Sequence, residues 1–288
     1  GNSVLFEVGI CVMAYLTVLY IEFLPIVTER FIGKVHFKGF FAKLNTIIDK
    51  LLRFVDRNLS RVMFFFIIAG VVLSCLHQSS LGTLMMLAGP KVHPLWQSPI
   101  SPLLFLLSAI SVGFPMVIME SIISSRSFGL KPEMDVLSSL GRYVGPILGI
   151  YLAFKIGDMV IRKTFVYLTV VNVPSVMWMI EVLIGVIIPL RMFFWDKVLH
   201  SKPLIFTASL LVVFGVLLNR FNVFVTSYTP PYSQQAYFPS IGEISITVGF
   251  IAMEIVLYRL FVMIFPVISQ PVKNLRPKTK FAAKGVIR

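Results

Sequence analysis

The sequence is poor in charge, because only 14% of its 288 residues are Asp, Glu, Lys or Arg. A soluble domain carries about a quarter of such residues, and the mean hydropathy here is +0.88. Hydrophobic residues make up 57% of the chain and form long continuous runs. Continuous runs exclude the short alternating segments of a membrane β-barrel and indicate membrane-spanning helices, which satisfy their own backbone groups.

Motifs for redox and nucleotide chemistry are also missing. The two cysteines, Cys11 and Cys75, lie in apolar runs, which predicts small packing residues and excludes a thiolate set for an iron–sulfur or zinc site. The chain has no Walker A loop, no dinucleotide glycine fingerprint and no CxxCH haem attachment. Only His77 lies well inside an apolar run, whereas a transmembrane b-haem needs two axial histidines. We therefore expect no metal, haem or cluster here, and any electrons must come from a partner.

Seven apolar runs each approach the roughly 20 residues that span a bilayer. They cover about residues 4–27, 62–87, 100–123, 143–162, 174–192, 203–220 and 246–267. Between the first two, the apolar residues of 40–59 recur at helical spacing, which predicts an amphipathic helix on the membrane surface or against a partner subunit. The predicted fold class is an all-α polytopic bundle of about seven transmembrane helices plus one interfacial helix, in a single membrane domain over 1–288.

The basic residues are distributed unevenly among the predicted connections. One side of the bundle holds twenty of the 26 Lys and Arg residues, mostly in 28–61 and in the tail, and the other side holds four. Because basic connections stay in the cytoplasm, the N-terminus is predicted outside and the C-terminus inside a prokaryotic cytoplasmic membrane. Topology thus explains the net charge of +13 without nucleic-acid binding.

Four carboxylates, Glu7, Asp158, Glu181 and Glu254, lie inside the apolar runs. An ionisable side chain at membrane depth is costly, so its presence indicates a partner, a cavity or a function. The function that such groups favour is proton movement or the binding of a polar headgroup such as a quinone.

The first helix places Glu7, Tyr15 and Glu22 on one stripe, because their spacings of eight and seven residues are close to whole helical turns. A carboxylate and a phenol can hydrogen-bond a quinone carbonyl and exchange its protons. Histidine is a common proton relay in proteins, so His77 is a candidate for the same site. The predicted quinone-binding residues are therefore Glu7, Tyr15 and His77; a helix-packing seam and a structural histidine are the alternatives.

A second group of residues predicts a proton path. Asp158 lies three residues after Lys155 and four before Arg162, so it can pair with either cation. The whole predicted path consists of Glu22, Glu120, Asp158, Glu181, Glu254 and Arg259. Ion pairs that only fix the helix packing are the alternative.

Several runs of the chain resemble one known family. HQSSLGTLMMLAGPKVHPLWQSPISPLLFLLSAI (77–110), SVLFEVGICVMAYLTVLYIEFLP (3–25), WMIEVLIGVIIPL (178–190) and YFPSIGEISITVGFIAMEIVLYR (237–259) are similar to segments of the NrfD/polysulfide-reductase membrane subunits. The similarity is strongest to the branch of the hydrogenase subunit HybB and the DsrP- and HmcC-type proteins, and it covers nearly the whole chain.

The resemblance implies a subunit that reacts with menaquinone or ubiquinone near the outer face, has no redox centre of its own and is not catalytic alone. It implies a ferredoxin-like iron–sulfur partner on the outer face, a further catalytic or multihaem cytochrome c subunit, and in some members proton translocation. In the resemblance Glu7 matches the carboxylate at the head of the pocket-forming helix. Family members usually have helices before the segment matching 3–25, so we expect these on another chain or beyond this sequence, or else an altered quinone site. A proton-coupled secondary transporter and a purely structural anchor remain as alternatives.

Overall fold

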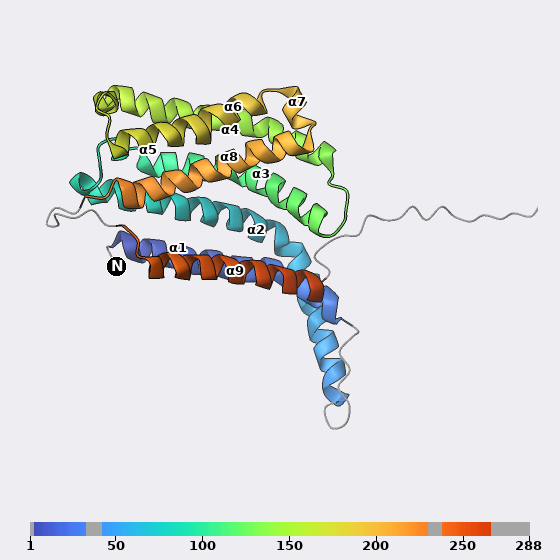
Figure 1. Ribbon diagram of the computed structural model, residues 1–288. Helices are drawn as coiled ribbons and strands as arrows, with labels where there is room; N and C mark the ends of the chain where they lie inside the picture. The colour runs from blue at the N-terminus through green and yellow to red at the C-terminus, as the bar shows by residue number, and fades with distance from the viewer. Residues whose placement is uncertain (1–2, 33–41, 230–237, 266–288) are drawn as a thin grey trace, which may run out of the picture. The chain divides into compact units, whose positions relative to one another are not determined.

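A computed structural model describes residues 3–32, 42–229 and 238–265. In these ranges the chain is helical almost throughout (Figure 1). The α-helices are α1 (Val4–Phe31), α2 (Ala42–Ala88), α3 (Ser101–Ser127), α4 (Met134–Ile161), α5 (Val173–Val182), α6 (Ile188–Phe193), α7 (Asp196–Leu199), α8 (Lys202–Phe221) and α9 (Ile241–Ile264).

Seven helical segments are long and apolar enough to cross a membrane, as predicted. They cover 5–31, 61–91, 101–127, 134–161, 173–193, 202–226 and 241–264. The all-α polytopic fold class is therefore confirmed. The fourth and seventh segments begin earlier than predicted, because a helix continues into polar sequence until a residue breaks its hydrogen bonding, whereas hydropathy locates only the apolar part.

The predicted amphipathic helix is present, but it is not a separate element. Residues 42–59 form the first part of α2, which continues without interruption into the second span. The sequence between Leu59 and Val62 contains neither Gly nor Pro, so nothing ends the helix there. Phe40 and Phe41, which belong to the predicted apolar face, lie outside the described residues. That this part of α2 lies on the membrane surface stays a prediction.

The chain forms two compact units, Gly1–Glu22 with Val62–Ser240, and Phe23–Arg61 with Ile241–Arg288. In the first unit α3 packs against both α4 and α8 (Figure 1). Ile118, Leu148, Ile205 and Val212 are almost completely buried at the centre of this packing. In the second unit the ring of Phe23 lies edge-on to that of Phe261, 5.3 Å between centroids. The single domain over 1–288 stays a prediction.

Two glycines bring the fifth and sixth spans into backbone contact. A Cβ atom built on Gly185 would lie 2.3 Å from the Cα of Gly215, and one built on Gly215 would lie 2.2 Å from the Cα of Gly185. Gly185 belongs to a π-helical turn over Leu183–Ile187. Pro189, four residues later, has no N–H to donate to the Gly185 carbonyl, which favours this wider turn.

Replacing Gly185 by Ala is expected to lower the melting temperature of the solubilised protein. The new methyl group meets backbone rather than a movable side chain, and overpacking of this kind costs about 1–3 kcal/mol or more. Gly157→Ala is the matched control, because nothing lies within 4 Å of a Cβ at that position. Equal melting temperatures for the two variants would contradict the close helix contact.

Candidate functional site

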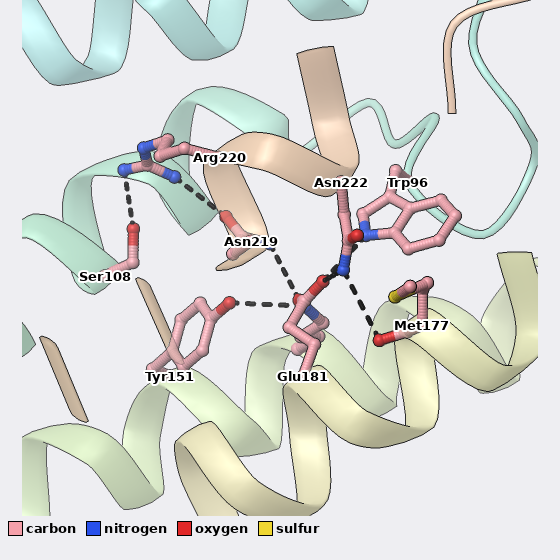
Figure 2. Close-up of polar contacts among 9 residues, drawn as sticks. Trp96, Ser108, Tyr151, Met177, Glu181, Asn219, Arg220 and Asn222 are labelled. Carbon is pink, nitrogen blue, oxygen red and sulfur yellow. Dashed lines mark hydrogen bonds and ion pairs between the residues drawn. The ribbon is translucent and has the colours of Figure 1, made fainter. Parts of the chain in front are cut away.

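A buried carboxylate, Glu181 of α5, lies at the centre of a polar cluster within the first unit (Figure 2). Its side chain is 1% exposed and forms an ion pair with Lys155 of α4. One oxygen also accepts a hydrogen bond from Asn219 at 2.8 Å. The other accepts from the Trp96 indole N–H at 3.0 Å and from Asn222 at 2.9 Å. The carboxylate is thus satisfied by one cation and three neutral donors from different parts of the chain.

One face of α4 carries a row of polar side chains, of which Tyr151 and Lys155 join the cluster around Glu181. Tyr151, Lys155, Asp158 and Arg162 follow at intervals of four, three and four residues, which places them on one side of the helix. The Lys155 amine lies 3.3 Å from the Tyr151 hydroxyl and 5.9 Å from the centre of the Trp178 ring. Trp178 is three residues before Glu181 on α5, so the same turn that carries the acid also covers the amine.

Arg220 near the end of α8 adds a second, half-buried cation. It donates to Ser108 at 2.9 Å and to Asn219 at 2.9 Å (Figure 2). It also donates to Gln78 at 3.2 Å. Its guanidinium carbon lies 3.8 Å from the centre of the Phe105 ring. No carboxylate within the described ranges pairs with Arg220. Asn219 therefore links this guanidinium to Glu181, and the cluster holds two cations for one acid.

Asp158 and Arg162 form a second pair at the end of α4. The Arg162 Nη2 atom lies 2.6 Å and its Nε atom 2.8 Å from one oxygen of Asp158. Arg162 also donates to the carbonyl oxygen of Pro94 at 3.0 Å and to that of Gln97. The ion pair thus anchors the segment that joins α2 to α3. Charge-assisted bonds of this kind are about twice as strong as neutral ones.

The same connecting segment positions Trp96. His93 accepts a hydrogen bond from the Leu95 N–H at its Nδ1 atom, and its backbone N–H donates to the Ser227 carbonyl at 2.8 Å. Burial lowers the pKa of the His93 imidazole below its ordinary value, because desolvation disfavours the charged form. A neutral ring at pH 7 suits its edge contacts with Trp96 and Tyr167. His93 is therefore a structural residue of the site.

Two spaces adjoin these charged groups. A cavity of about 30 Å³ is lined by Tyr151, Lys155, Asp158 and Arg162 among others, which is room for about two water molecules. An open groove of about 480 Å³ lies between the 99–100 segment and α4, with Asp158 and Arg162 at its polar part. Phe154 and Ile161, which line the groove, are exposed at 45% and 82%. Asp158 and Arg162 border both spaces and so separate the groove from the buried cluster.

The structure brings together only some of the predicted site residues. Asp158 and Glu181 are connected through Lys155. Lys155 forms an ion pair with Glu181 and lines the small cavity together with Asp158. Glu7 is exposed and Tyr15 is half-buried on α1. His77 is half-buried on α2, and its Nδ1 atom is buried without a hydrogen-bond partner among the described residues. Within those ranges no side-chain hydrogen bond or ion pair joins Glu7, Tyr15 and His77.

The remaining predicted residues are not members of this cluster. Glu22 is half-buried against Gly70 of α2. Glu120 is exposed on α3, and Glu254 and Arg259 are exposed on α9 in the second unit. No ion pair involving these four side chains is present in the part of the chain that the structure describes.

Sequence reasoning missed the neutral donors and one cation of the cluster. The sequence assigns Arg220, at the very end of the predicted 203–220 span, to the following connection, but the sixth span continues to residue 226 through a π-helical turn over Asn222–Thr226, and Arg220 lies inside it. The available signal was the polar group Asn219, Arg220 and Asn222 at the end of an apolar run. Lys155 was expected near Asp158, and the structure pairs it with Glu181 instead.

These features define a multi-pass helical membrane protein with a hydrogen-bonded ion-pair cluster inside its bundle. The chain matches the family model described as "Polysulphide reductase, NrfD" over residues 2–231. It therefore belongs to the NrfD polysulphide reductase family, as the resemblance predicted.

Named relatives support this assignment. A "Probable Ni/Fe-hydrogenase 2 b-type cytochrome subunit" of Escherichia coli (strain K12) is 33% identical over 276 residues, which cover 95% of this chain and 65% of that protein. A "Menaquinone reductase, integral membrane subunit" of Nitratidesulfovibrio vulgaris (strain Hildenborough) is 25% identical over 291 residues, covering 93% and 66%. The chain thus spans just under two thirds of the length of the curated relatives it matches.

Proposed function

We propose that the chain is a quinone-reactive membrane subunit of a respiratory electron-transfer complex, which passes electrons between a partner iron–sulfur subunit and membrane quinone. The observation that carries this proposal is the groove of about 480 Å³ at Asp158 and Arg162. Its wall is apolar at Ile100 and Phe154, and its polar part is an ion pair. A quinone likewise combines an apolar part, its tail, with a polar part, its two carbonyl groups, so each part has a matching surface in the groove.

The groove residues suit the chemistry of a quinone headgroup. Reduction to quinol takes two electrons, which the partner supplies, and two protons. In the proposed complex Arg162 donates a hydrogen bond to one carbonyl oxygen, where negative charge develops on reduction. Asp158 accepts from Arg162 and is the nearest group able to exchange a proton with that oxygen.

The buried cluster supports a proton supply behind the groove. Lys155 and Asp158 face the same cavity of about 30 Å³, and Lys155 is paired with Glu181. Water in this cavity would connect the two ion pairs, because a proton moves only between groups in hydrogen-bond reach. We therefore keep Asp158 and Glu181 as the first members of a proton path. Glu22, Glu120, Glu254 and Arg259 remain candidates for its continuation.

The first-helix residues are a second candidate position for the headgroup. The unpartnered Nδ1 atom of His77 favours it, since a buried polar atom without a partner is rare in a folded protein. In this arrangement Glu7, Tyr15 and His77 contact the headgroup as the sequence predicts. The two positions differ in the helices that they use, so variants distinguish them.

The partners and the membrane belong to the same proposal. The relative named as a menaquinone reductase subunit supports menaquinone or ubiquinone as the substrate. We propose an iron–sulfur subunit on the outer face, a further catalytic or multihaem cytochrome c subunit, and a prokaryotic cytoplasmic membrane with the N-terminus outside. The absence of haem stays a prediction, and another relative is named a b-type cytochrome subunit.

A structural anchor is the rival that the geometry also favours, because Glu181 and Asp158 are each paired with a cation. An anchor needs the pairs but has no use for an open groove beside them. The groove at Asp158 is therefore the feature that separates the two proposals. No observation on the described residues favours a proton-coupled transporter.

The function is tested on the complex purified from the membrane with its partners. We expect the reduced complex to transfer electrons to a short-chain menaquinone or ubiquinone analogue. Glu7→Gln is expected to raise the KM for the analogue by less than twofold if the headgroup lies in the Asp158 groove, and by tenfold or more if it lies at the first helix. A complex that reduces no quinone analogue would overturn the function at both positions.

A further inference from the structure

A second groove lies at the opposite ends of the helices from the Asp158 site. It has a volume of about 520 Å³ and is formed by the last turns of α3, the 130–132 segment and the first turns of α8. Its apolar lining includes Ile122, Ile123, Leu130 and Phe206. All of these elements belong to the first compact unit. The groove is distinct from the proposed quinone site, with which it shares no lining residue.

Two cations lie at this groove. Arg126 comes from the last turn of α3 and Lys202 from the first residue of α8, and both are exposed lining residues. Neither has an ion pair or side-chain hydrogen bond within the described ranges. No Asp or Glu lines the groove. The groove therefore combines an apolar wall with two positive charges that no acid neutralises.

We propose that this groove binds an anionic phospholipid of the surrounding bilayer, with its phosphate between Arg126 and Lys202 and an acyl chain along Ile123 and Phe206. Basic pockets between transmembrane helices on the cytoplasmic side suit anionic headgroups. Arg126 and Lys202 both belong to the connections that the charge distribution predicts to be cytoplasmic. The apolar wall selects a lipid over a free anion, because inorganic phosphate has nothing to place there.

The proposal is tested with the chain of 288 residues in detergent, titrated with phosphatidylglycerol or cardiolipin and followed by native mass spectrometry. Each cation near a phosphate contributes about fivefold in affinity, from roughly 1 kcal/mol per charge. The double variant R126Q/K202Q is therefore expected to weaken the binding of the anionic lipids about 25-fold. Phosphatidylcholine is expected to bind equally to the wild type and the double variant.

Two controls make the result specific. R142Q/K197Q removes two exposed cations, one on α4 and one on α7, that do not line the groove, and less than a twofold change is expected. R126K/K202R keeps both charges and is expected to keep the affinity, which separates charge from folding. Unchanged binding to R126Q/K202Q, or an equal loss in R142Q/K197Q, would overturn the proposal. Displacement of the lipid by millimolar inorganic phosphate would overturn it too, since the site would then recognise a free anion.

Discussion

Replacing Glu181 by Gln is expected to lower the free energy of unfolding of the solubilised protein by about 3–5 kcal/mol, because it leaves a buried cation without its counter-ion. Lys155 is 7% exposed and has Glu181 as its only acidic partner in the described structure. Arg220 is joined to the same acid through Asn219. The variant therefore leaves the two cations of the cluster without an acid. Unfolding followed by tryptophan fluorescence in a denaturing detergent measures the change.

The partner variant is expected to be milder. In Lys155→Met the carboxylate of Glu181 keeps its three neutral donors, Trp96, Asn219 and Asn222. The double variant K155M/E181Q removes both charges of the pair, so it is expected to be more stable than E181Q alone. A double variant whose loss equals the sum of the single losses would contradict the direct pairing of Lys155 with Glu181.

Replacing Asp158 by Asn is expected to raise the KM for the quinone analogue by about tenfold to a hundredfold. The acid holds Arg162 in place through two contacts, and a hydrogen bond to a charged group contributes about 1.5–3 kcal/mol. Without it the guanidinium keeps only the carbonyl groups of Pro94 and Gln97 as fixed partners. The steady-state rate of the purified complex as a function of quinone concentration measures this change.

Asp135→Asn is the matched control for Asp158→Asn. Asp135 lies in the first turn of the same helix, α4, is exposed, and lines neither the groove nor the cavity. Its replacement is expected to leave the KM unchanged within twofold. If both variants raise the KM equally, the effect comes from the charge of α4 as a whole and not from a headgroup in the groove.

The sequence predicted the spans well because hydropathy and helix length are local properties. The same locality explains what it missed. Glu181 was recognised as a costly buried acid, but its partners come from α4, from α8 and from the 92–100 segment, and no spacing rule connects those positions. Arg220 was misplaced since the π-helical turn at Asn222–Thr226 extends its span beyond the apolar run. A pairing of Asp158 with Lys155 or Arg162 was predictable, because spacings of three and four residues on one helix are visible in sequence, and the structure selects Arg162.

The groove was also beyond sequence reasoning, because it depends on how the 97–101 segment packs against α4. The prediction of a headgroup at Glu7, Tyr15 and His77 came from one helical stripe and a resemblance. The structure adds a second position in which an ion pair and an apolar wall already adjoin. The proposal for the chain therefore rests on the location of the headgroup.

Photolabelling of the purified complex with an azido-quinone tests that location most directly. Peptide mapping by mass spectrometry is expected to find the label on residues 97–101 and 153–162, with protection by an excess of unlabelled quinone. Label confined to peptides that contain Glu7 or His77, or label that excess quinone does not displace, would contradict a quinone headgroup beside Asp158 and Arg162.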